Sequence, residues 1–258
     1  MGSENRLSVW LYTDADNTLW DTNAVFAEAQ LQLLRKAEVV AGRVAPTTSR
    51  LEYLRRYDQA IARSHHARLR YPPALLFKAL ILGLQGLPDK VAAAQVVSSG
   101  ALLSEHEAEA VQEFQQEILG TPPLLPKVMA GLKRIHALGV PIYIITEGPV
   151  DVARERVRGL GIEHFTNGVL SATKTRELYL RLAEKASPLH PIMIGDQADR
   201  DIRLPHSADF TTVLVRSDFR PEWISDDDSA LADAIVPDFE SAILWVIGRF
   251  APQEETFG

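Results

Sequence analysis

Short apolar segments of this chain stop abruptly at polar residues, and amphipathic segments lie between them. We expect strands over residues 7–13, 140–146, 191–195, 210–215 and 234–236. Strands this uniformly apolar are typical of a parallel sheet that helices cover on both faces. The intervening residues 127–139, 151–161 and 175–186 carry apolar side chains at helical spacing, and Asp151 is expected to cap the second helix. This alternation predicts an α/β core, a doubly wound parallel sheet of Rossmann-like type.

One long segment lacks strand signals. Its sequence predicts helices over residues 24–40, 49–67, 73–84 and 104–119. Three closely spaced prolines, Pro122, Pro123 and Pro126, then mark the return to the alternating pattern. We therefore expect an all-helical cap domain at 22–121, inserted into a core domain formed by 1–21 and 122–258.

Composition excludes several functional classes. The chain has no cysteine, which rules out disulfides, thiolate nucleophiles and cysteine-bound zinc. The net charge of −7 gives no general reason to expect a nucleic-acid partner. The longest apolar stretch, which begins at Ala74, is interrupted by Lys78 and is too short to span a bilayer. We expect a soluble, cytoplasmic protein with no membrane or nucleic-acid partner.

Positive charge is concentrated in one part of the predicted helical domain. Residues 35–78 hold ten Lys or Arg and three acidic residues, so this segment carries +7 and the remainder −14. A solvated helix face is the simpler interpretation of such a run. The alternative is a positive surface that contacts an anionic substrate.

Polar side chains follow three of the predicted strands. Asp14 and Asp16 follow the first strand, Thr146 ends the second, and Asp196 follows a later one; Lys174 stands at the start of a helix between them. The carboxyl ends of parallel strands meet at one edge of a sheet, where ligands bind. Mg²⁺ prefers oxygen ligands and commonly shares them with a substrate phosphate. The pattern therefore predicts a site for a hard cation and a phosphate.

The order and spacing of these residues resemble the haloacid dehalogenase superfamily. The resemblance covers nearly the whole chain and includes a helical cap inserted after the first motif. The four motifs match Asp14, Asp16 and Thr18; Thr146; Lys174; and Asp196 with Asp201. The first and fourth are specific, whereas the second and third are single residues.

The resemblance implies a phosphatase that hydrolyses a small phosphomonoester through an aspartyl-phosphate. Asp14 would be the nucleophile. Asp16 would protonate the leaving oxygen and then accept a proton from water. Thr146 would donate a hydrogen bond to the phosphate, and Lys174 would balance the negative charge.

The resemblance also implies a bound Mg²⁺. Its ligands would be Asp14, Asp196 and the backbone carbonyl of Asp16. Asp201 would anchor the site through water or Lys174, and Thr18 would support it from outside the reacting groups.

Two residues depart from the family pattern. Asn17 stands where glycine is frequent, and asparagine tolerates the left-handed backbone that such a turn requires. Glu147 follows Thr146 where a neutral residue is commoner. Its carboxylate could repel phosphate, point away, pair with an arginine of the cap, or select a cationic group of the substrate.

Two other functions remain open. A 2-haloacid dehalogenase on the same fold needs no metal, so Asp16 and the acidic fourth motif would be superfluous. A binding or regulatory protein with a weak site finds support only in Glu147. Neither the phosphorylated substrate nor the oligomeric state follows from the sequence.

Overall fold

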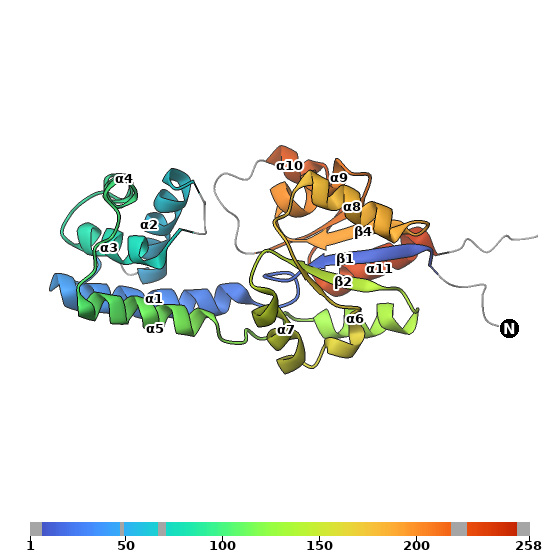
Figure 1. Ribbon diagram of the computed structural model, residues 1–258, viewed down its shortest axis with the longest axis horizontal. Coiled ribbons are helices and arrows are strands. Elements are labelled where there is room, and N and C mark those ends of the chain that lie inside the picture. The colour runs from blue at the N-terminus through green and yellow to red at the C-terminus, as the bar shows by residue number, and fades with distance from the viewer. Residues whose placement is uncertain (1–6, 47–48, 67–70, 218–225, 252–258) are drawn as a thin grey trace, which may run out of the picture. The chain divides into compact units, whose positions relative to one another are not determined.

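The computed structural model describes residues 7–46, 49–66, 71–217 and 226–251. Within them lies a parallel six-stranded sheet of order β3-β2-β1-β4-β5-β6 (Figure 1). Its strands are β1 (Val9–Asp14), β2 (Ile142–Thr146), β3 (Val169–Ser171), β4 (His190–Gly195), β5 (Thr211–Val215) and β6 (Ala234–Val236). The chain places β2 and β3 on one side of β1 and the later strands on the other. This reversal beside the central strand creates the crevice in which ligands of such sheets bind.

The expected α/β core is confirmed, and each predicted strand is present, with small shifts at its ends. One further strand, β3, was not predicted from the sequence. It is three residues long, lies at the edge of the sheet beside β2, and is partly exposed along its length. An edge strand of this kind has no continuous apolar run to reveal it.

Helices cover both faces of the sheet. They are α6 (Val128–Ala137), α7 (Val150–Gly159), α8 (Arg176–Ala186), α9 (Arg203–His206), α10 (Asp226–Ala230) and α11 (Phe239–Phe250). On one face, α6 and α11 pack on side chains such as Leu11 and Ile144. On the other, α8 packs on Tyr12, Ile145 and Met193. Figure 1 shows α6 and α8 on opposite sides of the sheet. Successive residues of a strand point to opposite faces, so both faces are apolar and the strands read as continuous apolar runs.

The prediction that Asp151 caps α7 was wrong. The N-cap is Pro149, and Asp151 lies in the first turn of the helix. A proline fits a helix start because its fixed φ suits the extended backbone that precedes the first turn, and an acidic residue in that turn is stabilised by the helix dipole.

An all-helical segment follows β1 directly. It contains α1 (Thr22–Ala41), α2 (Arg50–Ser64), α3 (Pro73–Leu84), α4 (Asp89–Ser99) and α5 (Glu105–Ile118). The described residues divide into two compact units: one runs to Thr22 and resumes at Thr121, and the other spans Asn23–Gly120. Four of the helices were predicted, and Ala67, the predicted end of one, lies outside the described residues. The missed helix, α4, is rich in alanine and has no clear apolar face.

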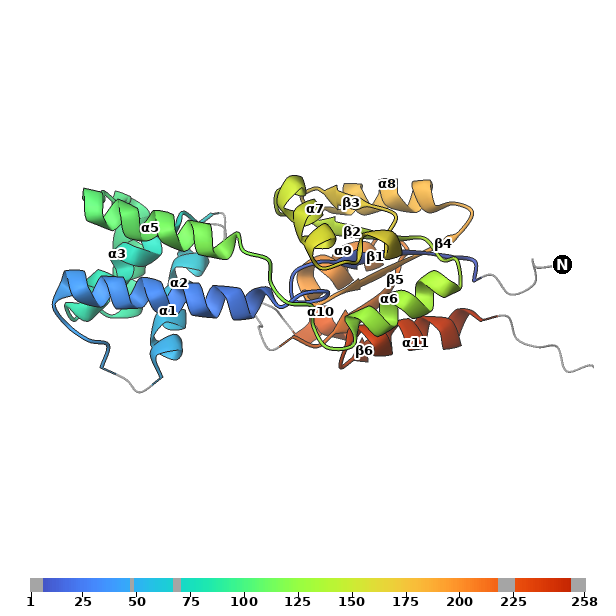
Figure 2. The ribbon, with the colours of Figure 1, turned by 90° about the horizontal axis from the view of Figure 1, so that it is seen from below.

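The helical unit has its own apolar core. Leu33, Leu54, Phe77 and Leu80 are among the side chains that are fully buried within it. α1 and α5 run side by side in both views (Figures 1 and 2). The ring of Phe26 on α1 contacts that of Phe114 on α5 edge to face. Each unit therefore has the buried interior that holds a domain together.

The basic segment 35–78 is largely paired with acids of the same helical unit. Arg68 and Arg70 lie outside the described residues. Five of the eight others form the following ion pairs: Arg35–Glu28, Lys36–Glu113, Arg50–Glu38, Arg56–Asp89 and Lys78–Glu107. Local pairing of this kind leaves less free positive charge than the sequence count suggests.

Among the described residues, every helix is too short or too polar to cross a bilayer.

Two glycines test how tightly the helices pack. A Cβ at Gly131 in α6 would lie 2.8 Å from Cδ1 of Phe239 and 3.2 Å from Cα of Glu240, whereas one at Gly248 in α11 would meet nothing within 4 Å. Overpacking at a buried contact costs about 1–3 kcal/mol. In an open helical position, alanine gains up to about 1 kcal/mol over glycine.

We expect Gly131→Ala to lower the thermal unfolding midpoint and Gly248→Ala to leave it unchanged or raise it. Thermal denaturation monitored by circular dichroism checks both variants in parallel. Equal shifts of the same sign would contradict the close approach of α6 to α11.

Candidate active site

The register of the sheet brings the ends of three strands together. Asp14, the last residue of β1, pairs with Ile145, so Thr146 lies one residue beyond it on the neighbouring strand. Thr13 pairs with Ile194 on the other side, so Gly195 is level with Asp14 there and Asp196 lies one residue beyond it. The residues that follow these strands therefore gather at the carboxyl edge of β1.

The Lys174 ammonium is the centre of this site. It comes from the loop before α8, where Thr175 caps the helix by accepting a hydrogen bond from the backbone N–H of Leu178. Its Nζ donates to Oδ1 of Asp14 and, at 2.6 Å, to Oδ1 of Asp201. The Lys174 and Asp14 side chains are 4% and 8% exposed, and that of Asp201 is fully buried. Lys174 thus joins two buried carboxylates from different parts of the chain.

The loop that follows β4 both carries Asp201 and fixes its carboxylate by a hydrogen bond. This loop continues into η3 (Ala198–Ile202), a π-helical turn. The second oxygen of Asp201 accepts a hydrogen bond from the backbone N–H of Gln197 at 3.1 Å. A Cβ on Gly195 would lie 2.4 Å from Cγ of Asp201, so only glycine leaves room for this carboxylate. Thr18 approaches the site from the other side, with Oγ1 3.5 Å from Oδ2 of Asp14.

Three acids gather in this part of the structure. One carboxylate oxygen each of Asp14, Asp196 and Asp201 lies within 4.8 Å of the others. Lys174 supplies one positive charge against three carboxylates, so the cluster has a surplus of negative charge when all three are ionised. Burial makes such a surplus costly.

The cost is visible in the pKa values. Burial raises the pKa of Asp14 to about 7; the charge of Lys174 opposes this rise and that of Asp201 adds to it. Burial also raises the pKa of Asp196 well above its ordinary value, with Asp14 and Asp201 adding to the effect. Although burial alone would lower the pKa of Lys174, Asp14 and Asp201 raise it well above its ordinary value.

Asp196 indicates what would relieve this cost. Both of its carboxylate oxygens are buried and lack a hydrogen-bond donor in the described part of the chain. The hydroxyl of Ser217 is near enough to oppose the rise in the pKa of Asp196, although it makes no hydrogen bond of normal geometry with either oxygen. Unpartnered carboxylate oxygens beside two further carboxylates fit a hard divalent cation, which prefers oxygen ligands. The donor set therefore suits such a cation better than a softer metal.

Asp16 has different partners. Its Oδ1 accepts hydrogen bonds from Trp20 Nε1 at 2.9 Å and from Thr22 Oγ1 at 2.5 Å, and lies 3.4 Å from Nη1 of Arg156. Its carboxylate is not part of the three-acid group. Asn17 has φ +59°, as expected for the tight turn that connects Asp16 to Trp20. Arg156, on α7, is a contact that sequence reasoning missed.

Thr146 and Glu147 follow each other at the end of β2. Oγ1 of Thr146 accepts a hydrogen bond from the backbone N–H of Gly148 at 3.0 Å, which leaves the hydroxyl proton available to a ligand. Glu147 forms an ion pair with Arg200 of η3. Arg200 belongs to the same α/β unit as Glu147.

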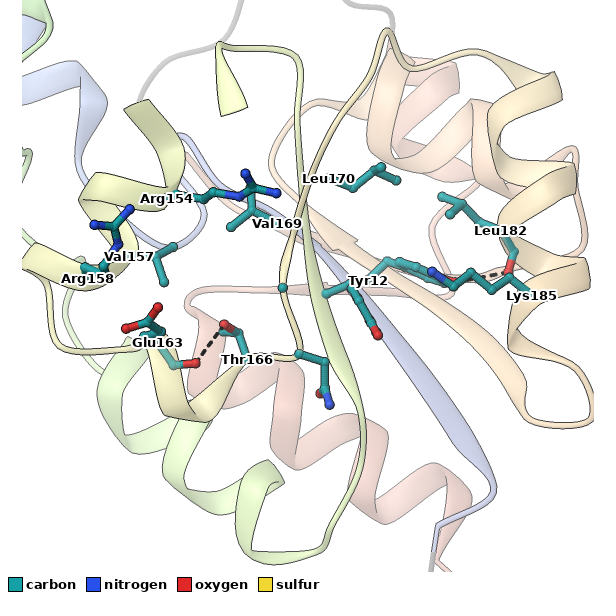
Figure 3. A pocket seen from close by; sticks show the side chains of 13 residues that line it. Tyr12, Arg154, Val157, Arg158, Glu163, Thr166, Val169, Leu170, Leu182 and Lys185 are labelled. Atoms are coloured by element: carbon teal, nitrogen blue, oxygen red, sulfur yellow. Dashed lines mark hydrogen bonds between the residues drawn. The ribbon is translucent and has the colours of Figure 1, made fainter. Parts of the chain in front are cut away.

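A cavity of about 520 Å³ lies elsewhere, around the edge strand β3 (Figure 3). Its walls include Arg154 and Arg158 from α7, Lys185 from α8, and the rings of Tyr12 and Tyr143. None of the residues predicted from the motifs lines it. This cavity is therefore separate from the predicted reactive centre.

Comparison with known proteins identifies a common family. The sequence pattern of the haloacid dehalogenase-like hydrolases matches residues 12–209. A glyceraldehyde 3-phosphate phosphatase from Methanopyrus kandleri is 25% identical over 239 residues, which cover 88% of this chain and 90% of that protein. A phosphoserine phosphatase from Thermus thermophilus is 28% identical over 130 residues, 47% of this chain. The chain spans about half the length of this second relative, 51%.

A solved structure shares the fold. The hydrolase YfnB from Bacillus subtilis, determined bound to magnesium, superposes with a TM-score of 0.63 at 16% identity. The match covers 93% of this chain and 99% of that one. At this level of identity the likeness shows the fold alone.

The raised pKa values predict how stability depends on pH without added metal. Asp14 keeps its proton up to about pH 7 in the folded chain, whereas the unfolded chain loses it near pH 4. Between these values the folded chain binds more protons, so the free energy of unfolding falls as the pH rises. The raised pKa of Asp196 acts in the same direction.

We expect Asp14→Asn to make this pH dependence shallower in buffers that contain a chelator. Urea denaturation between pH 5 and pH 8 measures it for both proteins. The same slope in wild type and variant would show that Asp14 is already ionised in the metal-free folded chain.

Proposed function

Because the chain belongs to the haloacid dehalogenase-like hydrolase family, we propose that it is a Mg²⁺-dependent phosphatase acting on a small phosphomonoester. The observation that carries this proposal is the buried surplus of carboxylates around Lys174, with the oxygens of Asp196 unpartnered. Two relatives with phosphatase names support the class of reaction. Their names also suggest small phosphorylated substrates, of which phosphoserine and glyceraldehyde 3-phosphate are the first to test.

In the proposed reaction Asp14 attacks the phosphorus, and the bond from phosphorus to the leaving oxygen breaks. The leaving oxygen takes a proton from Asp16. Water then attacks the aspartyl-phosphate and gives its proton to Asp16, and the bond between Asp14 and phosphorus breaks to release phosphate. Splitting one displacement into two easier steps is the benefit of a covalent intermediate.

The surrounding residues assist this chemistry. Lys174 donates a hydrogen bond to Asp14, so it would keep the nucleophile oriented and balance the charge of the incoming phosphate. Thr146 would donate its free hydroxyl proton to a phosphate oxygen. Asp201 would hold Lys174 in place, and Thr18 would limit the rotation of Asp14.

The residues that would hold Mg²⁺ are Asp14, Asp196 and the backbone carbonyl of Asp16. When bound, the ion neutralises negative charge on the transferring phosphoryl group. It would also offset the buried carboxylate surplus, so the cation and the fold would stabilise each other.

Asp16 needs a proton to act as an acid. Arg156, Trp20 and Thr22 all contact its Oδ1. We propose that Asp16 makes these contacts when no substrate is bound. When substrate binds, its carboxyl group would give up these contacts and hydrogen-bond to the leaving oxygen instead.

The proposal extends to the helical segment. Residues 22–121 would form a cap that excludes water from the site and selects the substrate, while 1–21 and 122–258 form the catalytic core. A cytoplasmic location and the absence of nucleic-acid partners remain expectations from the sequence.

The same observations give less support to the two alternative functions. A metal-independent dehalogenase has no use for the unpartnered acid at position 196. A regulatory protein with a degraded site was suggested by Glu147, but the carboxylate of Glu147 is paired with Arg200.

We expect the wild type to hydrolyse an aryl phosphate only when Mg²⁺ is present, with loss of activity in EDTA. Asp14→Asn should lower kcat at least about a thousandfold, since it removes the nucleophile. The matched control is Asp151→Asn, at a side chain that is 88% exposed on α7, which should retain activity.

A panel of phosphomonoesters and 2-haloacids separates the candidate functions. Undiminished turnover by Asp14→Asn would rule out the proposed nucleophile. Halide release in EDTA would favour the dehalogenase, and Mg²⁺ binding without any turnover would favour the regulatory protein.

A further inference from the structure

Glu147 is an unexpected neighbour for a phosphate. It follows Thr146 directly, at the carboxyl end of β2, and its side chain is only 10% exposed. A bare carboxylate in this position would repel an anionic ligand, and poor solvation would strengthen the repulsion. The contacts of Glu147 indicate why it is tolerated.

The two oxygens of Glu147 hold two different loops. Oε1 accepts a hydrogen bond from the backbone N–H of Lys174 at 2.9 Å. Oε2 forms an ion pair with the guanidinium of Arg200, which lies in η3. Hydrogen bonds to an ionised acceptor are about twice as strong as neutral ones. One buried side chain thus connects the end of β2 to both loops that supply the charged groups of the site.

Each of these loops carries a residue of the buried cluster. The Lys174 side chain contacts Asp14 and Asp201, and Asp201 is the neighbour of Arg200 in η3. The hydroxyl of Tyr179, on α8, donates to the backbone carbonyl of Arg200 at 3.1 Å. The start of α8 and η3 are therefore joined in three ways, through Lys174, through Glu147 and through Tyr179.

We propose that Glu147 is a positioning residue that fixes Lys174 against the acidic cluster, and that Arg200 cancels the charge of Glu147 so that phosphate can bind beside Thr146. This inference rests on the proposed phosphatase function for its second half alone. The first half concerns the geometry of Lys174 and holds for any reaction at Asp14.

The positioning role of Glu147 and the charge-cancelling role of Arg200 predict different effects of substitution. Glu147→Ala removes the acceptor for the Lys174 N–H, whereas Glu147→Gln keeps a carbonyl oxygen that can accept the same bond. Arg200→Gln leaves the hydrogen bond to Lys174 in place but removes the positive charge that Arg200 sets against the Glu147 carboxylate. The double variant Glu147→Gln with Arg200→Gln removes both charges and restores neutrality.

Hydrogen exchange followed by NMR tests the positioning half without any substrate. Losing a hydrogen bond to a charged acceptor is expected to speed exchange of the Lys174 amide at least about tenfold in Glu147→Ala. In Glu147→Gln the change is smaller. Exchange at the wild-type rate in Glu147→Ala would overturn the positioning role.

Binding of inorganic phosphate, measured by calorimetry with MgCl₂ present, tests the charge half. Arg200→Gln is expected to weaken phosphate binding by about tenfold or more, because like charges then face each other. The double variant should recover most of this loss, which a purely structural role of Arg200 would not produce. The matched control is Arg134→Gln on α6, which breaks an exposed ion pair with Glu240 of α11 and should leave phosphate binding unchanged.

Turnover of an aryl phosphate separates the same effects. Glu147→Ala should lower kcat, since Lys174 is misplaced, and Arg200→Gln should chiefly raise KM. A double variant that binds phosphate no better than Arg200→Gln would overturn the charge half. A wild-type chain that binds no phosphate would overturn the proposed function together with that half, while the exchange result would still decide the positioning role.

Discussion

The buried ammonium of Lys174 forms ion pairs with the buried carboxylates of Asp14 and Asp201. A third carboxylate, that of Asp196, lies beside them. One ammonium does not balance three carboxylates. The chain relieves part of the imbalance by binding protons, as the raised pKa values of Asp14 and Asp196 indicate. A divalent cation would relieve it more fully and would leave the carboxylates ionised for chemistry. The same imbalance that costs stability without a ligand is thus the basis for binding one.

The parallel sheet makes this arrangement possible. Because all its strands run the same way, the residues that follow β1, β2 and β4 emerge at one edge, and the reversal of strand order beside β1 leaves a crevice there. Small residues and tight turns then bring the charged groups into contact. Gly195 leaves the space that Asp201 fills, and Asn17 adopts the left-handed conformation that turns the chain after Asp16. The core supplies rigidity, and the loops supply the chemistry.

Much of this could be predicted from the sequence, for physical reasons. Fully buried parallel strands have to be apolar, so the runs before Asp14 and Asp196 were clear, and a polar residue at the end of such a run has to lie at the edge of the sheet. β3 and α4 lacked any comparable signal, since one is a short edge strand and the other has no apolar stripe. The partners of Glu147 could not be predicted either. Arg200 lies 53 residues away, and their contact depends on the path of η3 after β4. Arg156 reaches Asp16 from a helix whose position on the sheet the sequence pattern does not specify.

The central claim is that the acidic cluster holds a divalent cation while Lys174 keeps its contacts with Asp14 and Asp201. Anomalous diffraction from crystals grown with MnCl₂ tests it directly, because Mn²⁺ accepts the same oxygen ligands as Mg²⁺ and scatters strongly. The account predicts one anomalous peak at about 2.1 Å, the distance of Mg²⁺ from its ligands, from oxygens of both Asp14 and Asp196. A crystal with no peak there, in which the ammonium of Lys174 lies against Asp196 instead, would contradict it.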